Sequence, residues 1–232
     1  MNFSSIVVPA FVFSVISTSA LAVQGSKFST TLSKTALMNE SSDSSATIME
    51  TMIHTSNQKE LLIGVSLETG LYTQTQVKGK NGNSDSANAM AGIDVTVYID
   101  GVPAEPGTIT FNQRKQDLNA VLGGVIESCT FSTDQDGDGV VDDSLTITVE
   151  DDCIVTDEEI ELIQRTMSAH HFNFVAPNLT SGDHTISVEA VISTDTTAGS
   201  GSATATGLVG KGSLTVEAVR AINQNGGINI LE

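Results

Sequence analysis

The chain has 232 residues, 39% of them hydrophobic, and a formal net charge of −18. Such a negative charge repels the phosphates of nucleic acids and of anionic membranes, so we expect no nucleic-acid partner. The same charge favours solubility and the binding of divalent cations.

Residues 1–22 have the pattern of a secretory signal peptide. An apolar stretch from Ile6 to Ile16 precedes a Ser/Thr segment and then Ala20-Leu21-Ala22, a small-x-small cleavage site. An uncleaved membrane anchor is the alternative, although Pro9 and several serines interrupt a run that is short for a bilayer span. We therefore expect a secreted, extracellular or cell-surface protein without a membrane span in the mature chain.

The rest of the chain divides into an exposed leader and one domain. Residues 23–46 are rich in Ser and Thr with few large apolar residues, and within this leader we expect a first strand in the range 27–38. Residues 47–232 have the length of a single β-sandwich domain. Residues 127–160 form an acidic insertion in it.

Alternating apolar residues predict an antiparallel β-structure. Apolar and polar side chains alternate from Ile93 to Ile99, and Asp100-Gly101 then turns the chain. Alternate residues from Ile186 to Ile192 and from Leu214 to Ala218 are expected on inner faces, and Gly/Ser/Asn/Ala-rich segments at 78–89 and 194–206 are expected to be mobile loops. The expected strands cover residues 47–54, 61–77, 93–99, 107–113, 117–127, 144–150, 170–175, 184–193 and 212–219.

One short helix is expected at 156–168. Thr156-Asp157-Glu158-Glu159 is a capping-box signature, and Ile160, Ile163 and Met167 then fall on one helical stripe. The predicted fold class is therefore all-β, a two-sheet antiparallel β-sandwich with this one helix.

An Asp-rich segment carries the clearest chemical signal in the chain. Between Lys115 and Arg165 there are fourteen acidic residues and no basic one. Within this stretch Asp134, Asp136 and Asp138 stand at alternate positions of a glycine-containing segment. Calcium takes six to eight oxygen ligands, and carboxylates with this spacing can converge on one ion. The alternative is a hydrophilic turn without an ion.

Residues 134–143 resemble the calcium loops of thrombospondin type-3 repeats, dockerins and EF-hands. The resemblance assigns Asp134, Asp136 and Asp138 as ligands, followed by the Val140 backbone carbonyl and Asp142. The segment departs from these families where the closing acid should stand, because that position is occupied by Leu145. The acids that can replace it are Asp143, Glu150, Asp151 and Asp152.

Cys129 and Cys153 are the only cysteines, and they bracket the Asp-rich segment. An even pair in an exported protein predicts a disulfide, with two buried free thiols as the alternative. Closing a loop of about 25 residues should stabilise the fold by roughly 3.5 kcal/mol in the chain-entropy model.

Other candidate chemistry is weaker. His170 and His171 suggest a transition-metal site that His54 and His184 would complete, but neighbouring strand residues point to opposite faces. The serines lack a Gly-x-Ser-x-Gly pattern, and the acids are too abundant for any pair of them to indicate a glycosidase. We therefore expect no enzyme, with a hydrolase as the least favoured function.

Segments near His54 and at 212–217 resemble a group of uncharacterised exported β-sandwich proteins, and the C-terminal half resembles jelly-roll or C1q/TNF-like sandwiches, with an Ig-like sandwich as the alternative. This resemblance bears on fold only. The expected function is that of a secreted calcium-binding β-sandwich with a structural, adhesive or assembly role. Its partner would be a protein or glycan at the cell exterior, or a second copy of the chain. A carbohydrate-binding module is the alternative, although the chain has no Trp and only Tyr72 and Tyr98.

Overall fold

The structure, a computed structural model, describes residues 27–33, 37–39, 44–56, 59–129 and 153–219. These residues form strands joined by turns and contain no helix, so the all-β prediction is confirmed. No helix in the described ranges is long and apolar enough to cross a membrane.

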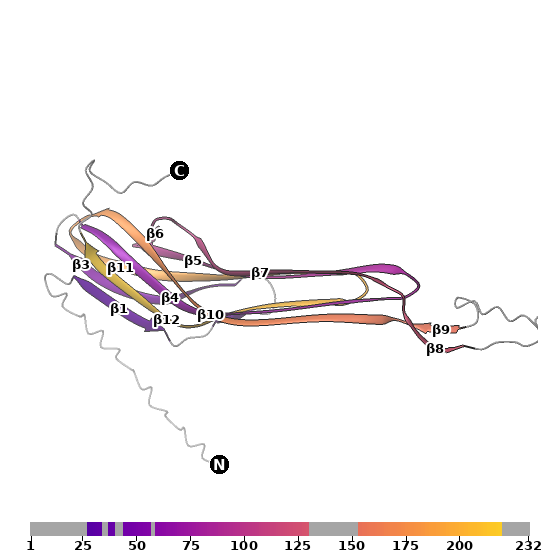
Figure 1. Ribbon diagram of the computed structural model, residues 1–232. Helices are drawn as coiled ribbons and strands as arrows, with labels where there is room; N and C mark the ends of the chain where they lie inside the picture. Colours follow the sequence, from indigo (N-terminus) through magenta and orange to yellow (C-terminus); the bar gives the residue numbers. More distant parts are fainter. Residues whose placement is uncertain (1–26, 34–36, 40–43, 57–58, 130–152, 220–232) are drawn as a thin grey trace, which may run out of the picture.

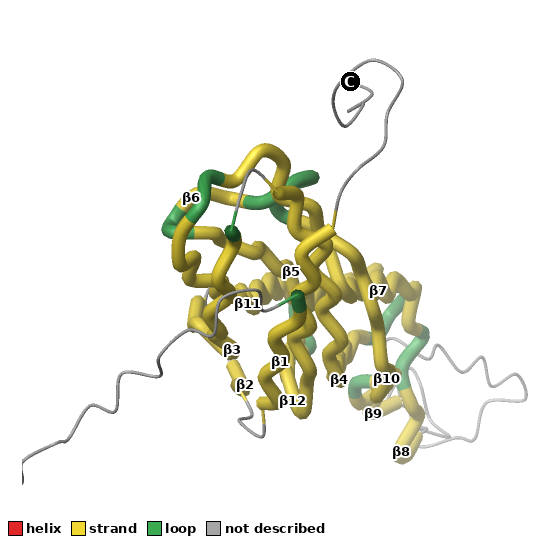
Figure 2. Tube along the Cα trace, turned by 90° about the vertical axis from the view of Figure 1, so that its left-hand side faces the viewer, coloured by secondary structure: helices red, strands yellow, loops and turns green. Residues whose placement is uncertain are grey.

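The strands form two antiparallel sheets packed face to face, and a short hairpin at one end (Figures 1 and 2). Sheet A has the order β1 (Phe28–Ser33), β12 (Ser202–Val219), β4 (Lys59–Gly79), β10 (Glu158–Leu179), and β2 (Leu37–Asn39) also pairs with β12. Sheet B has the order β3 (Ser44–Thr55), β11 (Gly182–Ala198), β5 (Asn83–Ile99), and both β6 (Val102–Pro103) and β7 (Ile109–Leu122) pair with β5. The hairpin consists of β8 (Val125–Cys129) and β9 (Cys153–Thr156).

The hydrophobic core lies between the two sheets. The predicted inner residues from Ile93 to Ile99 and from Ile186 to Ile192 are all buried, which confirms the period-two alternation. Phe174 of β10 is fully buried in the same core. One side of the sandwich is closed by contacts between β1 and β3, where the Ser29 and Thr51 hydroxyls lie 2.6 Å apart.

Both sheets continue beyond this core as a narrow arm (Figure 1). The arm includes the segments 78–89 and 194–206, so the prediction of two mobile loops there was wrong. The chain reverses within only a few residues, as at Asn81 and Gly82, whose φ angles of 57° and 73° suit a tight hairpin. Small residues such as Ala87, Ala89 and Ala205 are buried between the two sheets of the arm, where Ala87 packs with the larger Val77 and Leu122.

The prediction of a helix at 156–168 is also wrong, because Thr156 ends β9 and residues 158–168 belong to β10. From Glu158 opposite Gly79 to Ala176 opposite Leu61, β10 pairs with β4 without a register shift. A capping-box signature is a local preference, and a continuous ladder of backbone hydrogen bonds with a neighbouring strand outweighs it. Within residues 23–46, β1 pairs with β12 at the other end of sheet A.

The interior of the arm holds a polar cluster centred on Gln116 of β7. Gln116 is 5% exposed and accepts a hydrogen bond of 2.9 Å from the Thr73 hydroxyl. Its amide nitrogen donates to the Thr75 hydroxyl at 2.7 Å and to the Leu162 carbonyl at 2.9 Å. One buried amide therefore joins sheet B to both β4 and β10 of sheet A.

Replacing Gln116 by alanine should destabilise the arm, because it leaves the fully buried hydroxyls of Thr73 and Thr75 without this partner. We expect a loss of roughly 2–4 kcal/mol in the free energy of unfolding, measured by urea denaturation. Gln113→Ala on the same strand is the control, because Gln113 is exposed and should cost under about 0.5 kcal/mol. Equal losses in the two variants would contradict the role of the cluster.

Candidate calcium site and its anchorage

The predicted calcium ligands Asp134, Asp136, Asp138, Val140 and Asp142 lie outside the described residues. The structure describes the two ends of their segment, which are Cys129 of β8 and Cys153 of β9. These residues face each other across the hairpin and form a disulfide with an S–S distance of 2.00 Å. The predicted disulfide is confirmed, and both ends of the acidic segment leave from one point.

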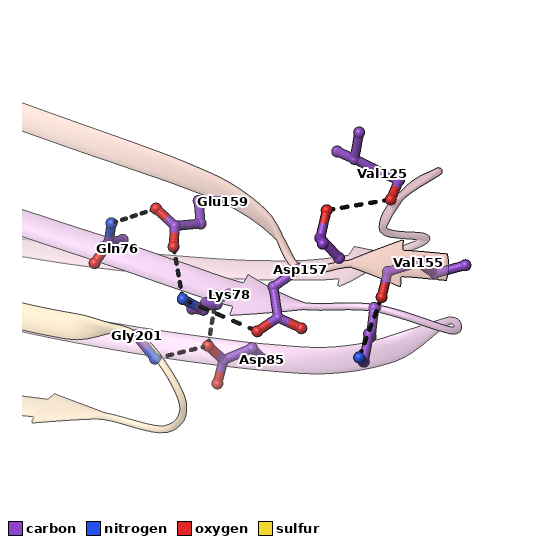
Figure 3. A network of polar contacts seen from close by, with 10 residues as sticks. Gln76, Lys78, Asp85, Val125, Val155, Asp157, Glu159 and Gly201 are labelled. Carbon is purple, nitrogen blue, oxygen red and sulfur yellow. Dashed lines mark hydrogen bonds and ion pairs between the residues drawn. The ribbon is translucent and has the colours of Figure 1, made fainter. Parts of the chain in front are cut away.

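The β8–β9 hairpin is attached to the far end of the arm (Figure 3). The Lys80 ammonium donates to the Val155 carbonyl at 3.2 Å, and the Thr156 hydroxyl donates to the Val125 carbonyl at 3.3 Å. Gly124, which precedes β8, has a φ of 89°, and a Cβ there would lie 2.6 Å from Val155 Cγ1. The chain can therefore enter the hairpin this closely only through a glycine.

Lys78 places a positive charge beside the acids that follow the hairpin. Its ammonium lies 2.8 Å from the Glu159 carboxylate and 3.9 Å from that of Asp157. The hydrogen bond and the charge of Glu159 raise the pKa of Lys78 above its ordinary value. These side chains are exposed enough that the pairs orient the strands more than they stabilise the fold.

Asp85 of β5 links three segments of the arm through backbone amides. Its carboxylate accepts hydrogen bonds from the N–H groups of Lys78 at 2.8 Å, Ser200 at 3.0 Å and Gly201 at 3.2 Å. The bonds from Lys78 and Ser200 lower the pKa of Asp85. The β11–β12 turn lies so close to β4 that a Cβ on Gly201 would be 1.8 Å from the Gln76 carbonyl oxygen, so only glycine fits.

Asp85→Ala should release the β11–β12 turn from the arm. We expect faster amide hydrogen exchange at Lys78, Ser200 and Gly201, because their N–H groups lose their acceptor. Asp195→Ala removes one carboxylate from the exposed part of β11 and serves as the control with the same charge change. Unchanged exchange at Ser200 and Gly201 in the Asp85 variant would refute this role.

The histidines do not gather at one point among the described residues. His170 lies on the inner face of β10, with its ring centre 6.5 Å from that of Phe111, while His171 contacts the Ser66 hydroxyl at 2.8 Å. The two side chains thus point to opposite faces, as the strand prediction requires. Within the described ranges, no group of three or more His, Cys, Asp or Glu residues is placed to hold a metal ion.

His184, which is buried, pairs with the exposed Asp100 at the opposite end of the sandwich. Its Nδ1 lies 2.7 Å from the Asp100 carboxylate and its Nε2 lies 2.9 Å from the Thr180 carbonyl. Both partners are acceptors, so both ring nitrogens can donate at the same time only when the ring is protonated. Burial opposes this charge, but the bonds to Asp100 and Thr180 outweigh it and raise the pKa of His184 above 6.5.

Because the pKa of His184 is raised by folding, its contribution to stability is complete below about 6.5 and declines as the pH rises through the folded-state pKa. His184→Gln should therefore cost roughly 1–3 kcal/mol in the free energy of unfolding at pH 6, and less at each step from pH 7 to 9. Urea denaturation at these pH values measures the difference. His171→Gln is the exposed control. A cost that stays constant with pH would show that the imidazolium pair is not responsible.

The aromatic residues considered for sugar binding do not form an exposed row within the described ranges. Tyr72 is half-buried on the outer face of sheet A, and the Arg165 guanidinium lies 5.3 Å above the centre of its ring. Tyr98 is half-buried in sheet B. One face of Tyr72 is therefore already covered by a side chain of this protein.

Comparisons with known proteins add little. No protein-family model matches the chain, and no curated protein matches it. A solved structure described as that of the infectious bursal disease virus Gx strain is similar, with a TM-score of 0.30 and 15% sequence identity. The match covers 85% of this chain but only 32% of the viral chain, and a similarity this weak indicates neither a shared fold nor a shared function.

Proposed function

We propose that the protein is a secreted or cell-surface β-sandwich that binds calcium in the acidic segment at the end of its arm. Its role is structural, adhesive or in assembly, with a protein or a glycan at the cell exterior as its partner. The signal-peptide pattern of residues 1–22 and the presence of a disulfide support export, since structural disulfides persist in oxidising compartments.

The observation that carries the proposal is the cross-strand disulfide at the end of the arm. It fixes Cys129 and Cys153 at facing positions, and the Asp-rich segment lies between these two residues. Holding the ends together lowers the entropy cost of gathering several carboxylates around one ion. The acids repel one another without a cation, so a bound calcium ion would neutralise the segment.

The proposed ligands are Asp134, Asp136, Asp138, the Val140 carbonyl and Asp142. Closure of the shell falls to another nearby acid such as Asp143 or Glu150, since Leu145 cannot supply an oxygen from its side chain. With an incomplete set of ligands we expect a dissociation constant of roughly 10⁻⁴ to 10⁻³ M, the range of extracellular modules.

Calcium should stabilise the oxidised protein. At 10 mM calcium this affinity corresponds to about 1.4–2.7 kcal/mol of added stability and a rise in Tm of roughly 3–10 °C in a thermal scan. The double variant Asp134→Ala with Asp138→Ala should lose the rise, because it removes two of the proposed ligands. Titration calorimetry on the same samples measures the binding directly.

Asp195→Ala with Glu217→Ala is the matched control, because it removes two exposed acids from strands of the sandwich. This control should keep the full response to calcium. If the parent protein neither binds calcium nor gains stability at 10 mM, the assignment fails. If the control loses the response as well, the effect comes from net charge and not from the segment.

A further inference from the structure

Strand β10 has one hydrogen-bonded edge and one largely free edge. It pairs with β4 along its length, whereas its other edge forms a single bridge among the described residues, at Val175. There the N–H of each of Val175 and Glu105 donates to the carbonyl of the other at 2.9 Å. From Glu158 to Phe174 no described strand pairs with this edge.

The bridge at Val175 fixes which backbone groups face outward. In an antiparallel ladder, alternate residues direct both their N–H and C=O groups to the same neighbour. Because the register with β4 is unbroken from Glu158 to Ala176, the odd-numbered residues direct these groups away from β4, as Val175 does. The backbone N–H and C=O groups of Glu161, Ile163 and Arg165 therefore have no strand partner among the described residues and can pair with another strand.

The side chains beside this edge are unusually apolar for an unpaired strand. Ile163 is 44% and Met167 58% exposed, and Ile160 and Leu162 are exposed as well. A groove of 330 Å³ lies beside Met167 on sheet A and is also lined by Leu208 and Gly70. Monomeric proteins usually protect such strand edges with charges, bulges or proline.

The charges on this edge of β10 are complementary to the charges on the same edge of a second copy that lies antiparallel to it. If two copies of β10 pair antiparallel about a two-fold axis at Ile163, Glu161 of each copy lies opposite Arg165 of the other. Ile163 then faces its own equivalent, and Glu161, Ile163 and Arg165 share one face of the strand. A two-fold interface requires this self-complementarity, and the sequence Glu161-Leu-Ile163-Gln-Arg165 has it.

We propose that β10 pairs with β10 of a second copy and joins the two A sheets into one continuous sheet. The pairing adds backbone hydrogen bonds at Ile163 and two Glu161–Arg165 contacts, and it brings the exposed Ile163 side chains of the two copies together. It gives the proposed assembly role a defined partner and rests on that role, but it does not require calcium. At physiological ionic strength the repulsion between the two acidic molecules is screened beyond about 8 Å.

A charge swap tests the register. Sedimentation velocity on the oxidised mature protein, in 150 mM NaCl with EDTA, should show a dimer that increases with concentration. Arg165→Glu and Glu161→Arg each place like charges opposite one another at both ends, so each should weaken dimerisation at least ten-fold. The double variant Glu161→Arg with Arg165→Glu restores opposite charges and should return the dissociation constant to within about three-fold of the parent.

Two further measurements make the result specific. Lys115→Glu on β7 changes the net charge as Arg165→Glu does and should leave dimerisation unchanged; thermal scans check that every variant is folded. Amide exchange at Glu161, Ile163 and Arg165 should slow as the protein concentration rises. A parent protein that stays monomeric up to 0.5 mM, or a double variant that is no better than the single ones, would overturn the proposal. EDTA keeps this outcome separate from the calcium test.

Discussion

The structure depends on the long backbone ladder between β4 and β10. The two strands stay in one register from the hydrophobic core to the end of the arm, where β9 leads into β10. In the core, buried side chains of β10 such as Phe174 support this ladder. In the arm, the side chains of β10 are largely exposed. Backbone hydrogen bonds therefore contribute more to the stability of the arm than a large apolar core does.

The arm compensates for its thin interior with polar contacts between the sheets. Small side chains such as Ala87 let the layers approach, and Gln116 then bridges β7 to two strands of the opposite sheet. Asp85 of β5 accepts a hydrogen bond from the backbone of the β11–β12 turn. An unpaired amide is costly at the buried position of Gln116, so its hydrogen bonds fix how the two layers sit on each other, and the half-buried Asp85 adds backbone contacts at the turn.

The sequence predicted the inner faces well where large apolar residues alternate, as from Ile93 to Ile99 and from Ile186 to Ile192. The prediction of a helix at 156–168 was wrong, because the acids near Thr156 and the spacing of Ile160, Ile163 and Met167 fit a helix as well as the observed strand. Ala, Ser and Thr at 78–89 and 194–206 resemble loop residues, since nothing local reveals that they extend long paired strands or that Ala87, Ala89 and Ala205 are buried between the sheets. The cysteines predicted the disulfide, whereas the anchoring roles of Lys78 and Asp85 depend on partners distant in sequence and left no local signal.

The disulfide affects which changes in sequence the fold can accommodate. Because Cys129 and Cys153 face each other on neighbouring strands, the covalent link completes the hairpin whatever chain is inserted between them. Insertions or exchanges in that interval leave the pairing of β8 with β9 and of β10 with β4 in place. The end of the arm is thus a position where new recognition sequences can be grafted while the supporting framework keeps its geometry.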